Sequence, residues 1–246
     1  MIQKRLRIFA GPNGSGKTSM LKIVNKEVSL GFYINADAIE KQITEKRKID
    51  LSAFGIETDE KKLHKFFQLS GFARDKSDAV ILKKSFSVSE NNIYVNNGGD
   101  LIAPEYAAAI IAEFLREENL KTGNDFSFET VMSHPDKIKF MRKANKQGYH
   151  CYLYFICTDD VRVNIDRIKT RVIEGGHHVP DNKVKTRYER TLNLLYEALR
   201  CCYKSYLFDN SDKTIEIARI DRDKAVYFSV EQGKLPNWFI KHVLSK

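Results

Sequence analysis

The chain has 246 residues, 42% of them hydrophobic, so it can bury the core of one large α/β domain or of two small ones. Its 41 lysines and arginines outnumber its 32 aspartates and glutamates, and the formal net charge of +9 favours anionic partners such as nucleotides, phosphorylated sugars or nucleic-acid backbones. No apolar run approaches the about 20 residues of a membrane span, and the first residues lack a signal-peptide pattern, so we expect a soluble, cytoplasmic protein without a membrane partner.

The first segment predicts a strand, a glycine loop and a helix. Leu6–Ala10 is a short β-branched and aromatic run that stops at Gly11, and apolar residues at helical spacing follow Lys17. Phe32–Asn35 predicts a second short strand, and the long crossover makes the two strands parallel. This β-α-β unit brings Asp37 to the loop edge that follows the second strand.

Residues 38–125 differ from the rest because they are charged and mostly helical in pattern. Helices are predicted around Leu63–Leu69, Ala79–Lys84 and Tyr106–Glu118, and the turn-rich stretch Asn91–Asp100 predicts a loop. We therefore expect a helical insertion over residues 38–125.

The remaining chain predicts the rest of a parallel sheet. The predicted elements are strands at Phe126–Val131, Cys151–Thr158 and Tyr206–Asn210, helices that begin near Ser133 and cover about 159–173 and 181–203, and a hairpin over residues 214–230. The sequence therefore predicts a single three-layer α/β domain over residues 1–246, with a mainly parallel five-stranded sheet and a C-terminal β-hairpin.

Four cysteines, Cys151, Cys157, Cys201 and Cys202, lack the paired C-x-x-C spacing of a zinc site or a redox dithiol. The first two lie inside an apolar run, where free cysteine behaves as a small hydrophobic residue. We expect all four to be reduced and buried.

A phosphate-binding motif lies between the first strand and the first helix. Gly11-Pro-Asn-Gly-Ser-Gly-Lys-Thr18 fits the pattern G-x-x-x-x-G-K-[ST] at every required position. In such a P-loop the backbone N–H groups surround the β-phosphate, the lysine reaches the β- and γ-phosphates, and the threonine hydroxyl binds Mg²⁺ at a helix N-terminus. The predicted cofactors are therefore ATP and Mg²⁺, with Thr18 as the metal ligand. The nucleotide-binding residues are Gly11, Pro12, Asn13, Gly14, Ser15, Gly16, Lys17, Thr18 and Ser19.

The motif leaves the reaction open, because P-loops serve kinases, motor and transporter ATPases, and switches. Transporter-type ATPases also carry an LSGGQ-like signature and an apolar strand that ends in Asp-Glu. Leu69-Ser-Gly-Phe72 is only a fragment of the signature, and Phe128-Glu-Thr130 is not such a strand end. The transporter interpretation is therefore disfavoured.

Two carboxylates lie at predicted strand ends. Asp37 follows the second strand, where it either acts as general base on an attacking hydroxyl or caps a helix that starts at Ala38; position alone leaves both readings open. Glu129 ends the third strand inside an apolar run, where a carboxylate is costly without a partner. A role in binding substrate hydroxyls or the magnesium shell is therefore favoured for Glu129.

A basic region over residues 167–190 surrounds a Gly-Gly hinge between two predicted helices. Its cations and imidazoles are Arg167, Arg171, His177, His178, Arg187 and Arg190. A lid that closes over ATP has this composition and brings arginines to the transferred phosphoryl group, whereas the alternative is a solvated helical face. Neither histidine has a metal-ligand partner at suitable spacing.

These motifs, in this order, resemble the zeta toxin family and its predicted-ATPase relatives among the P-loop kinases. The matching segments are Gly11–Thr18, Ile34-Asn-Ala-Asp37, Phe126-Ser-Phe-Glu-Thr130 and Arg167 through Gly175-Gly-His-His-Val-Pro180 to Arg190. The resemblance implies an ATP-dependent kinase fold, whose toxin members phosphorylate a hydroxyl of a UDP-N-acetyl sugar and pair with a protein antitoxin.

The resemblance also implies roles for individual positions. These are Lys17 and Thr18 on phosphate and metal, Asp37 as the base, Glu129 and Thr130 on the acceptor, and Arg167 or Arg171 with Arg187 as lid cations on ATP. The interval from Asp37 to Glu129 is longer than the toxin pattern, and Val131–His134 replace its Gly-Thr and basic residue. The acceptor is therefore left open.

The interpretation that uses most of these residues is an ATP-dependent phosphotransferase acting on a small-molecule hydroxyl. An alternative is a nucleotide-dependent ATPase that binds nucleic acid or a protein partner, which rests on the net charge and the P-loop without an RNA-binding motif. An inactive relative that binds ATP without turnover is a third.

Overall fold

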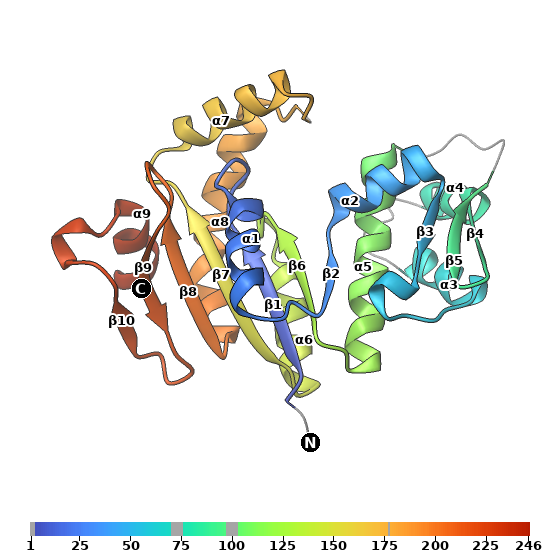
Figure 1. Ribbon diagram of the computed structural model, residues 1–246, viewed down its shortest axis with the longest axis horizontal. Coiled ribbons are helices and arrows are strands. Elements are labelled where there is room, and N and C mark those ends of the chain that lie inside the picture. The colour runs from blue at the N-terminus through green and yellow to red at the C-terminus, as the bar shows by residue number, and fades with distance from the viewer. Residues whose placement is uncertain (1–2, 70–75, 97–102, 177) are drawn as a thin grey trace. The chain divides into compact units, whose positions relative to one another are not determined.

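The computed structural model describes residues 3–69, 76–96, 103–176 and 178–246 and divides into two compact units (Figure 1). The first unit comprises Met1–Leu30 and Ser127–Lys246, and the second comprises Gly31–Phe126. The P-loop, Glu129 and the basic region therefore belong to the first unit, whereas Asp37 belongs to the second.

The sheet of the first unit has the strand order β10-β9-β8-β7-β1-β6. Its strands are β1 (Arg5–Ala10), β6 (Phe126–Thr130), β7 (His150–Cys157), β8 (Lys204–Asp209), β9 (Ile215–Ile220) and β10 (Val226–Phe228). Its helices are α1 (Lys17–Glu27), α6 (Asp136–Lys146), α7 (Val161–Ile173), α8 (Asp181–Cys201) and α9 (Asn237–Phe239), with short helical turns at Gln232–Lys234 and Ile240–Leu244.

Strands β1, β7 and β8 are parallel neighbours, so their carboxyl ends share one edge of the sheet. The predicted C-terminal hairpin is present as β9 and β10, which pair antiparallel. The predicted five-stranded sheet is too small, because β9 also pairs antiparallel with β8 and joins the hairpin to the sheet. Residue alternation could place a hairpin but could not reveal which strand it extends.

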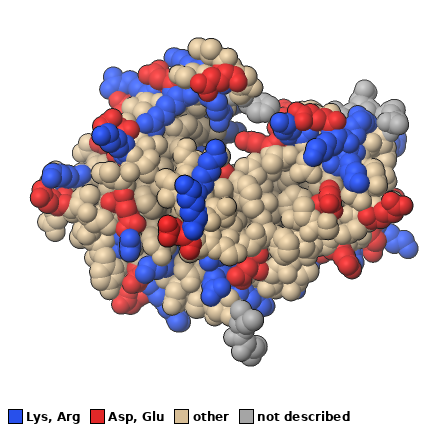
Figure 2. All heavy atoms as spheres, in the orientation of Figure 1, with Lys and Arg blue, Asp and Glu red and all other residues tan. Residues whose placement is uncertain are grey.

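Helices cover both faces of this sheet, which confirms the predicted three layers. Figure 1 shows α1 in front of the strands and α6 and α8 behind them. Figure 2 shows basic and acidic side chains interspersed over the visible face of the first unit.

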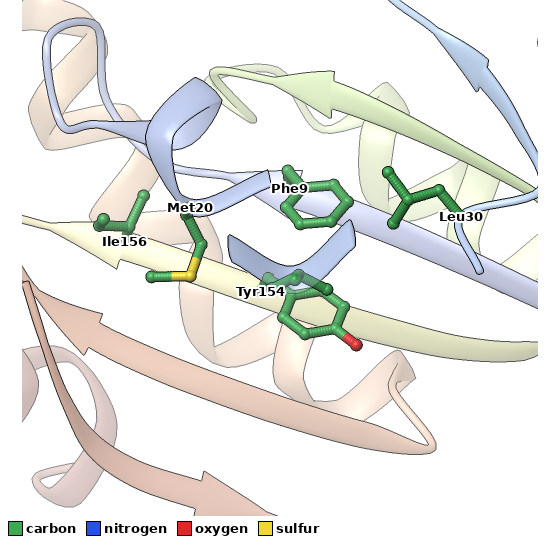
Figure 3. Close-up of a cluster of buried hydrophobic side chains, with 6 residues drawn as sticks. Phe9, Met20, Leu30, Tyr154 and Ile156 are labelled. Carbon is green, nitrogen blue, oxygen red and sulfur yellow. The ribbon is translucent and has the colours of Figure 1, made fainter. Parts of the chain in front are cut away.

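The α1 side of the sheet is held by one apolar cluster (Figure 3). Met20 and Val24 of α1 pack against Phe9 of β1 and Tyr154 of β7, and the rings of Phe9 and Tyr154 stack with centroids 4.9 Å apart. Full burial of such a side chain stabilises the fold by about 1.5–3 kcal/mol. The cluster thereby fixes the start of α1, and with it the P-loop, over β1 and β7.

The cysteines are free and buried, as predicted. Burial raises the pKa of Cys202 to about 12 and also raises the pKa of Cys157. Both thiols therefore stay protonated and act as packing groups.

The second unit combines helices with a three-stranded antiparallel sheet of order β3-β5-β4. Its elements are β2 (Phe32–Ile34), α2 (Ala36–Lys41), a helical turn at Gln42–Lys46, β3 (Lys48–Asp50), a turn at Ser52–Phe54, α3 (Glu60–Leu69), α4 (Lys76–Ser85), β4 (Phe86–Ser89), β5 (Asn92–Val95) and α5 (Pro104–Thr122).

Two details of the predicted insertion are therefore wrong. The region is not purely helical, and Asn92–Val95, predicted as loop, is the central strand of the small sheet. Residues 97–100 of the predicted loop lie outside the described residues. The strands were missed because three or four residues carry too little alternation to be separated from a loop.

Candidate functional site

The P-loop connects β1 to α1 in the backbone conformation that its glycines allow. Gly11, Gly14 and Gly16 have φ values of 153°, 75° and 102°, a region that residues with a side chain rarely adopt. Gly16 is the N-cap of α1 and supplies no side-chain hydrogen bond. The first N–H groups of α1 thus lack a side-chain cap, the arrangement that suits an anion at a helix N-terminus.

Close packing is a second reason for glycine in this loop. A Cβ atom on Gly11 would lie 2.0 Å from the carbonyl oxygen of Ile156 in β7. A Cβ atom on Gly14 would lie 2.5 Å from the carbonyl oxygen of Asn164 in α7. The loop is therefore pressed against backbone atoms on its outer side.

Lys17 reaches back across the loop that precedes it. Its Nζ donates to the carbonyl oxygens of Gly11 and Pro12 at 2.9 and 2.8 Å. The loop backbone thus positions the ammonium charge that the motif assigns to phosphate.

Thr18 and Glu129 are brought together although 111 residues separate them. The Thr18 hydroxyl donates to Oε2 of Glu129 at 3.2 Å, from the first turn of α1 to the end of β6. A hydroxyl beside a carboxylate offers the oxygen ligands that Mg²⁺ prefers. These two residues therefore fit a magnesium ion bound with the phosphates of a nucleotide.

Two buried polar atoms of the loop have no hydrogen-bond partner among the described residues. They are Oδ1 of Asn13 and Oγ of Ser15, and Ser15 is fully buried. Buried polar groups normally have hydrogen-bond partners, and a bound ion or ligand is one explanation for an unpaired group. Together with the uncapped helix and Lys17, they fit a site built for the phosphates of ATP.

The basic region forms two helices that pack on each other through Ile165 and Ile168 of α7 and Val184 of α8. Arg167 is partly buried, and its Nη1 donates to the carbonyl oxygen of Asn210 at 2.8 Å. Arg171 is exposed and Arg187 is partly buried. Arg167, one of the arginines predicted for a lid, is thus bonded to Asn210, whose side chain contacts the P-loop.

The other candidate residues of the basic region are exposed or lie outside the described residues. His178 and Arg190 are exposed, and His177 lies outside the described residues. In the described ranges, no group of three or more histidine, cysteine, aspartate or glutamate side chains is arranged to hold a metal ion.

Thr130 already has a partner within its own loop. Its hydroxyl accepts a hydrogen bond from the N–H of Met132 at 3.0 Å, and Met132 has a left-handed φ of 57°. The threonine therefore stabilises the turn after β6, and its contact with an acceptor stays a prediction.

Asp37 does not cap its helix. Helix α2 starts at Ala36, two residues earlier than predicted, and its N-cap is Asn35, whose Oδ1 accepts from the N–H of Ala38 at 3.1 Å. Asp37 is exposed in the first turn. The capping alternative is therefore wrong, and the role of general base stays a prediction.

Sequence reasoning missed Asn164 and Asn210, two asparagines that bond the P-loop. The amide Nδ2 of Asn164 donates to the carbonyl oxygen of Asn13 at 2.6 Å, and that of Asn210 donates to the carbonyl oxygen of Ser15 at 2.9 Å. The sequence signal for Asn210 is its place directly after β8, whereas Asn164 lies within α7 and carries no such signal.

A third missed residue, Tyr188, connects helix α8 to the same edge of the sheet. Its hydroxyl donates to the carbonyl oxygen of Thr158 at 2.6 Å. Burial raises the pKa of this hydroxyl well above its usual range. Tyr188 therefore stays protonated as a hydrogen-bond donor.

No family model matches this chain. Over 63 residues the sequence is 36% identical to an uncharacterized protein of Haemophilus influenzae. The matched segment covers 26% of this chain and 45% of that protein. The chain therefore matches less than half of that relative's length.

Solved structures resemble almost the whole chain. The native AvrRxo1-ORF1:-ORF2 complex contains a chain with a TM-score of 0.58 and 13% identity, covering 99% of this chain and 66% of that one. A chain of the PezAT chromosomal toxin-antitoxin system of Streptococcus pneumoniae matches with a TM-score of 0.50 and 13% identity, covering 100% of this chain and 80% of that one.

This chain shares its fold with chains of the AvrRxo1-ORF1:-ORF2 complex and of the PezAT system. The AvrRxo1-ORF1:-ORF2 complex with ATP also matches it, with a TM-score of 0.56 and 13% identity over 94% of this chain and 62% of that one. The chain spans less than two thirds of the length of these AvrRxo1 chains. At this level of identity the similarity is one of fold.

Within the described ranges no helix is long and apolar enough to cross a membrane.

Proposed function

We propose that this protein is an ATP-dependent phosphotransferase that moves the γ-phosphoryl group to a hydroxyl of a small molecule. The observation that carries the proposal is the P-loop with its lysine and with Thr18 bonded to Glu129 at the neighbouring strand end. The fold shared with a complex solved with ATP supports it.

Each part of the site has a task in this reaction. The N–H groups at the start of α1 and the Lys17 ammonium bind the β- and γ-phosphates, and Thr18 with Glu129 holds Mg²⁺. The bound ion would neutralise charge on the phosphates. Arg167, Arg171 and Arg187 are the lid cations that stabilise the charge of the transferred group.

Asp37 is the proposed general base. It accepts the proton of the acceptor hydroxyl while that oxygen bonds to the γ-phosphorus, and the bond from phosphorus to the bridging oxygen breaks to release ADP. Its exposed position in the first turn of α2, free of the capping role, leaves the carboxylate available for this task.

The finer proposals concern the acceptor and partners. By resemblance the acceptor is a UDP-N-acetyl sugar bound by Glu129 and Thr130, and residues 1–246 act as one kinase domain with residues 38–125 as acceptor cap, 167–190 as lid and 214–230 as hairpin. The similar solved structures come from a two-protein complex and a toxin-antitoxin system, which supports a protein antitoxin as partner.

The nucleic-acid-dependent ATPase has less support. The net charge of +9 motivates it, yet basic and acidic side chains are interspersed on the visible face of the first unit (Figure 2). Nucleic-acid binding normally uses basic residues gathered on one face.

The test incubates the purified chain and Mg²⁺ with γ-labelled ATP and, separately, nucleotide sugars, nucleosides and short RNAs. Transfer of label to a hydroxyl compound is expected, and Asp37→Asn should abolish transfer while ATP binding is retained. Glu60→Gln is the matched control, because it removes a carboxylate from the first turn of α3 in the same unit.

The outcomes separate the alternatives. RNA-stimulated release of phosphate without label transfer would favour the ATPase, and ATP binding without turnover would favour the inactive relative. Transfer that persists in Asp37→Asn would refute the assignment of the base.

A further inference from the structure

Asn210 lies at the centre of four hydrogen bonds at the carboxyl edge of the sheet. Its N–H donates to the carbonyl oxygen of Cys157 at 2.8 Å, which fixes its backbone beside β7. Its Oδ1 accepts from the Thr214 hydroxyl at 2.8 Å, so its Nδ2 is directed to the carbonyl oxygen of Ser15 at 2.9 Å. The fourth bond is the one its carbonyl accepts from Arg167.

Asn164 makes the equivalent contact from α7. Its Oδ1 accepts from the hydroxyl of Thr158, and its Nδ2 donates to the carbonyl oxygen of Asn13 at 2.6 Å. Asn164 is fully buried, so this bond is shielded from competing water. The orientation of both amides is unambiguous, because a backbone carbonyl can only accept.

The two bonded carbonyls are alternate groups of the loop, and this has a consequence for the peptide planes. In a trans peptide the carbonyl oxygen and the next N–H point in opposite directions. Holding the carbonyls of Asn13 and Ser15 on the outer side therefore turns the N–H groups of Gly14 and Gly16 to the opposite side, where the motif requires donors for phosphate.

The glycines make these contacts feasible. A Cβ atom on Gly16 would lie 2.5 Å from Nδ2 of Asn210, and the Cβ position of Gly14 is similarly close to the backbone of Asn164. The asparagines thus occupy the space that a side chain at either glycine would need.

We propose that Asn164 and Asn210 are positioning residues of the nucleotide site, whose amides hold the P-loop with two of its N–H groups directed at the phosphates. The inference rests on the proposed function only for the ligand, ATP. Asn210 also joins Arg167 to this arrangement, so one residue positions both the loop and a lid cation.

The experiment compares Asn164→Ala, Asn210→Ala and the control Asn145→Ala by calorimetric titration with ATP and, separately, with inorganic pyrophosphate, both with Mg²⁺. Asn145 is matched because its Nδ2 donates to the carbonyl oxygen of Cys201 at 2.7 Å, away from the loop. Each site variant should weaken binding of both ligands about five- to tenfold, and the control should leave both affinities unchanged.

Titration with pyrophosphate, which lacks adenine, distinguishes positioning of the P-loop from direct contact with the adenine base of ATP. If Asn210 held the adenine, Asn210→Ala would weaken ATP binding alone, and the inference would be overturned. It would also be overturned if the site variants bound like wild type, or if Asn145→Ala lost affinity equally.

A milder change covers the case in which an asparagine variant does not fold. Thr214 is exposed, so Thr214→Val keeps the fold and removes only the bond that orients the Asn210 amide. It should lower both affinities about twofold, and unchanged affinities would refute the role of Asn210. Wild-type protein that binds neither ligand would refute the proposed function and this inference together, whereas binding without transfer would refute the function alone.

Discussion

Replacing Gly11 with alanine tests how the P-loop is held against the sheet. The new Cβ would lie 2.0 Å from the carbonyl oxygen of Ile156, at a backbone φ of 153° that favours glycine. Ile156 cannot withdraw easily, because β7 pairs with β1 on one side and with β8 on the other. Either the protein loses stability or the loop moves off the sheet.

The magnitude follows from two costs. Backbone strain of this kind costs about 1–3 kcal/mol, and overpacking against atoms that cannot move costs about 1–3 kcal/mol. Gly11→Ala should therefore lower the free energy of unfolding by about 2–6 kcal/mol, or, where the loop relaxes outward, lower the affinity for ATP instead.

Urea denaturation and calorimetric titration with ATP measure the two outcomes. Gly148→Ala is the matched control, since Gly148 has a φ of 83° but no atom of the described residues within 4 Å of its Cβ position. It should cost about 1 kcal/mol of stability and leave ATP binding unchanged. Gly11→Ala with the stability of the control and the ATP affinity of wild type would refute the reasoning.

Three further results are expected. Lys17→Ala should lower the affinity for ATP and abolish transfer, because it removes the ammonium group that the carbonyls of Gly11 and Pro12 hold at the loop. Normal ATP binding in a filter assay would show that the loop geometry is wrong. The four buried thiols should not react with a thiol reagent at pH 8 until guanidinium unfolds the chain. The reason is that the thiols are inaccessible and that burial raises the pKa of Cys157 and Cys202. Rapid labelling of the native protein would contradict their burial. Burial, with Arg222 and Arg5 nearby, lowers the pKa of His150 in the folded protein. As the pH falls, the unfolded chain therefore binds a proton at this histidine before the folded chain does. The free energy of unfolding should decrease as the pH drops through the pKa of the unfolded chain, about 6.5. His150→Phe preserves a ring against Tyr203 and should reduce this pH dependence in urea denaturation, and an unchanged dependence would exclude His150 as its source.

The predicted elements were most accurate where the periodic signal was long. The apolar run predicted at Cys151–Thr158 is β7, His150–Cys157, and the helix predicted at Tyr106–Glu118 is α5, Pro104–Thr122. The strands β3, β4 and β5 of the small antiparallel sheet were missed, because they are only three or four residues long. A strand of that length is defined by its pairing partners, which the local sequence does not contain.

For the candidate site too, the features encoded in a short stretch of sequence were predicted, and those that depend on distant residues were not. Residue types and spacing identified Lys17, Thr18 and the glycines, because their chemistry is local to eight consecutive positions. Glu129 was identified because a carboxylate inside an apolar strand costs free energy unless it has a partner. In the structure the Thr18 hydroxyl donates a hydrogen bond to it. The cap of α2 could not be decided from the sequence, since Asn35 and Asp37 are both good capping residues and differ only in where the helix begins.

By itself, the sequence determined that this protein has a phosphate-binding loop between a strand and a helix, since glycine, lysine and threonine at those spacings carry their chemistry with them. Only the tertiary structure decided what holds that loop in place. Asn164 and Asn210 lie 151 and 195 residues beyond the loop positions that they bond. Their function arises from strands that end at a common edge of the sheet, and no local pattern records which distant amide will meet which carbonyl.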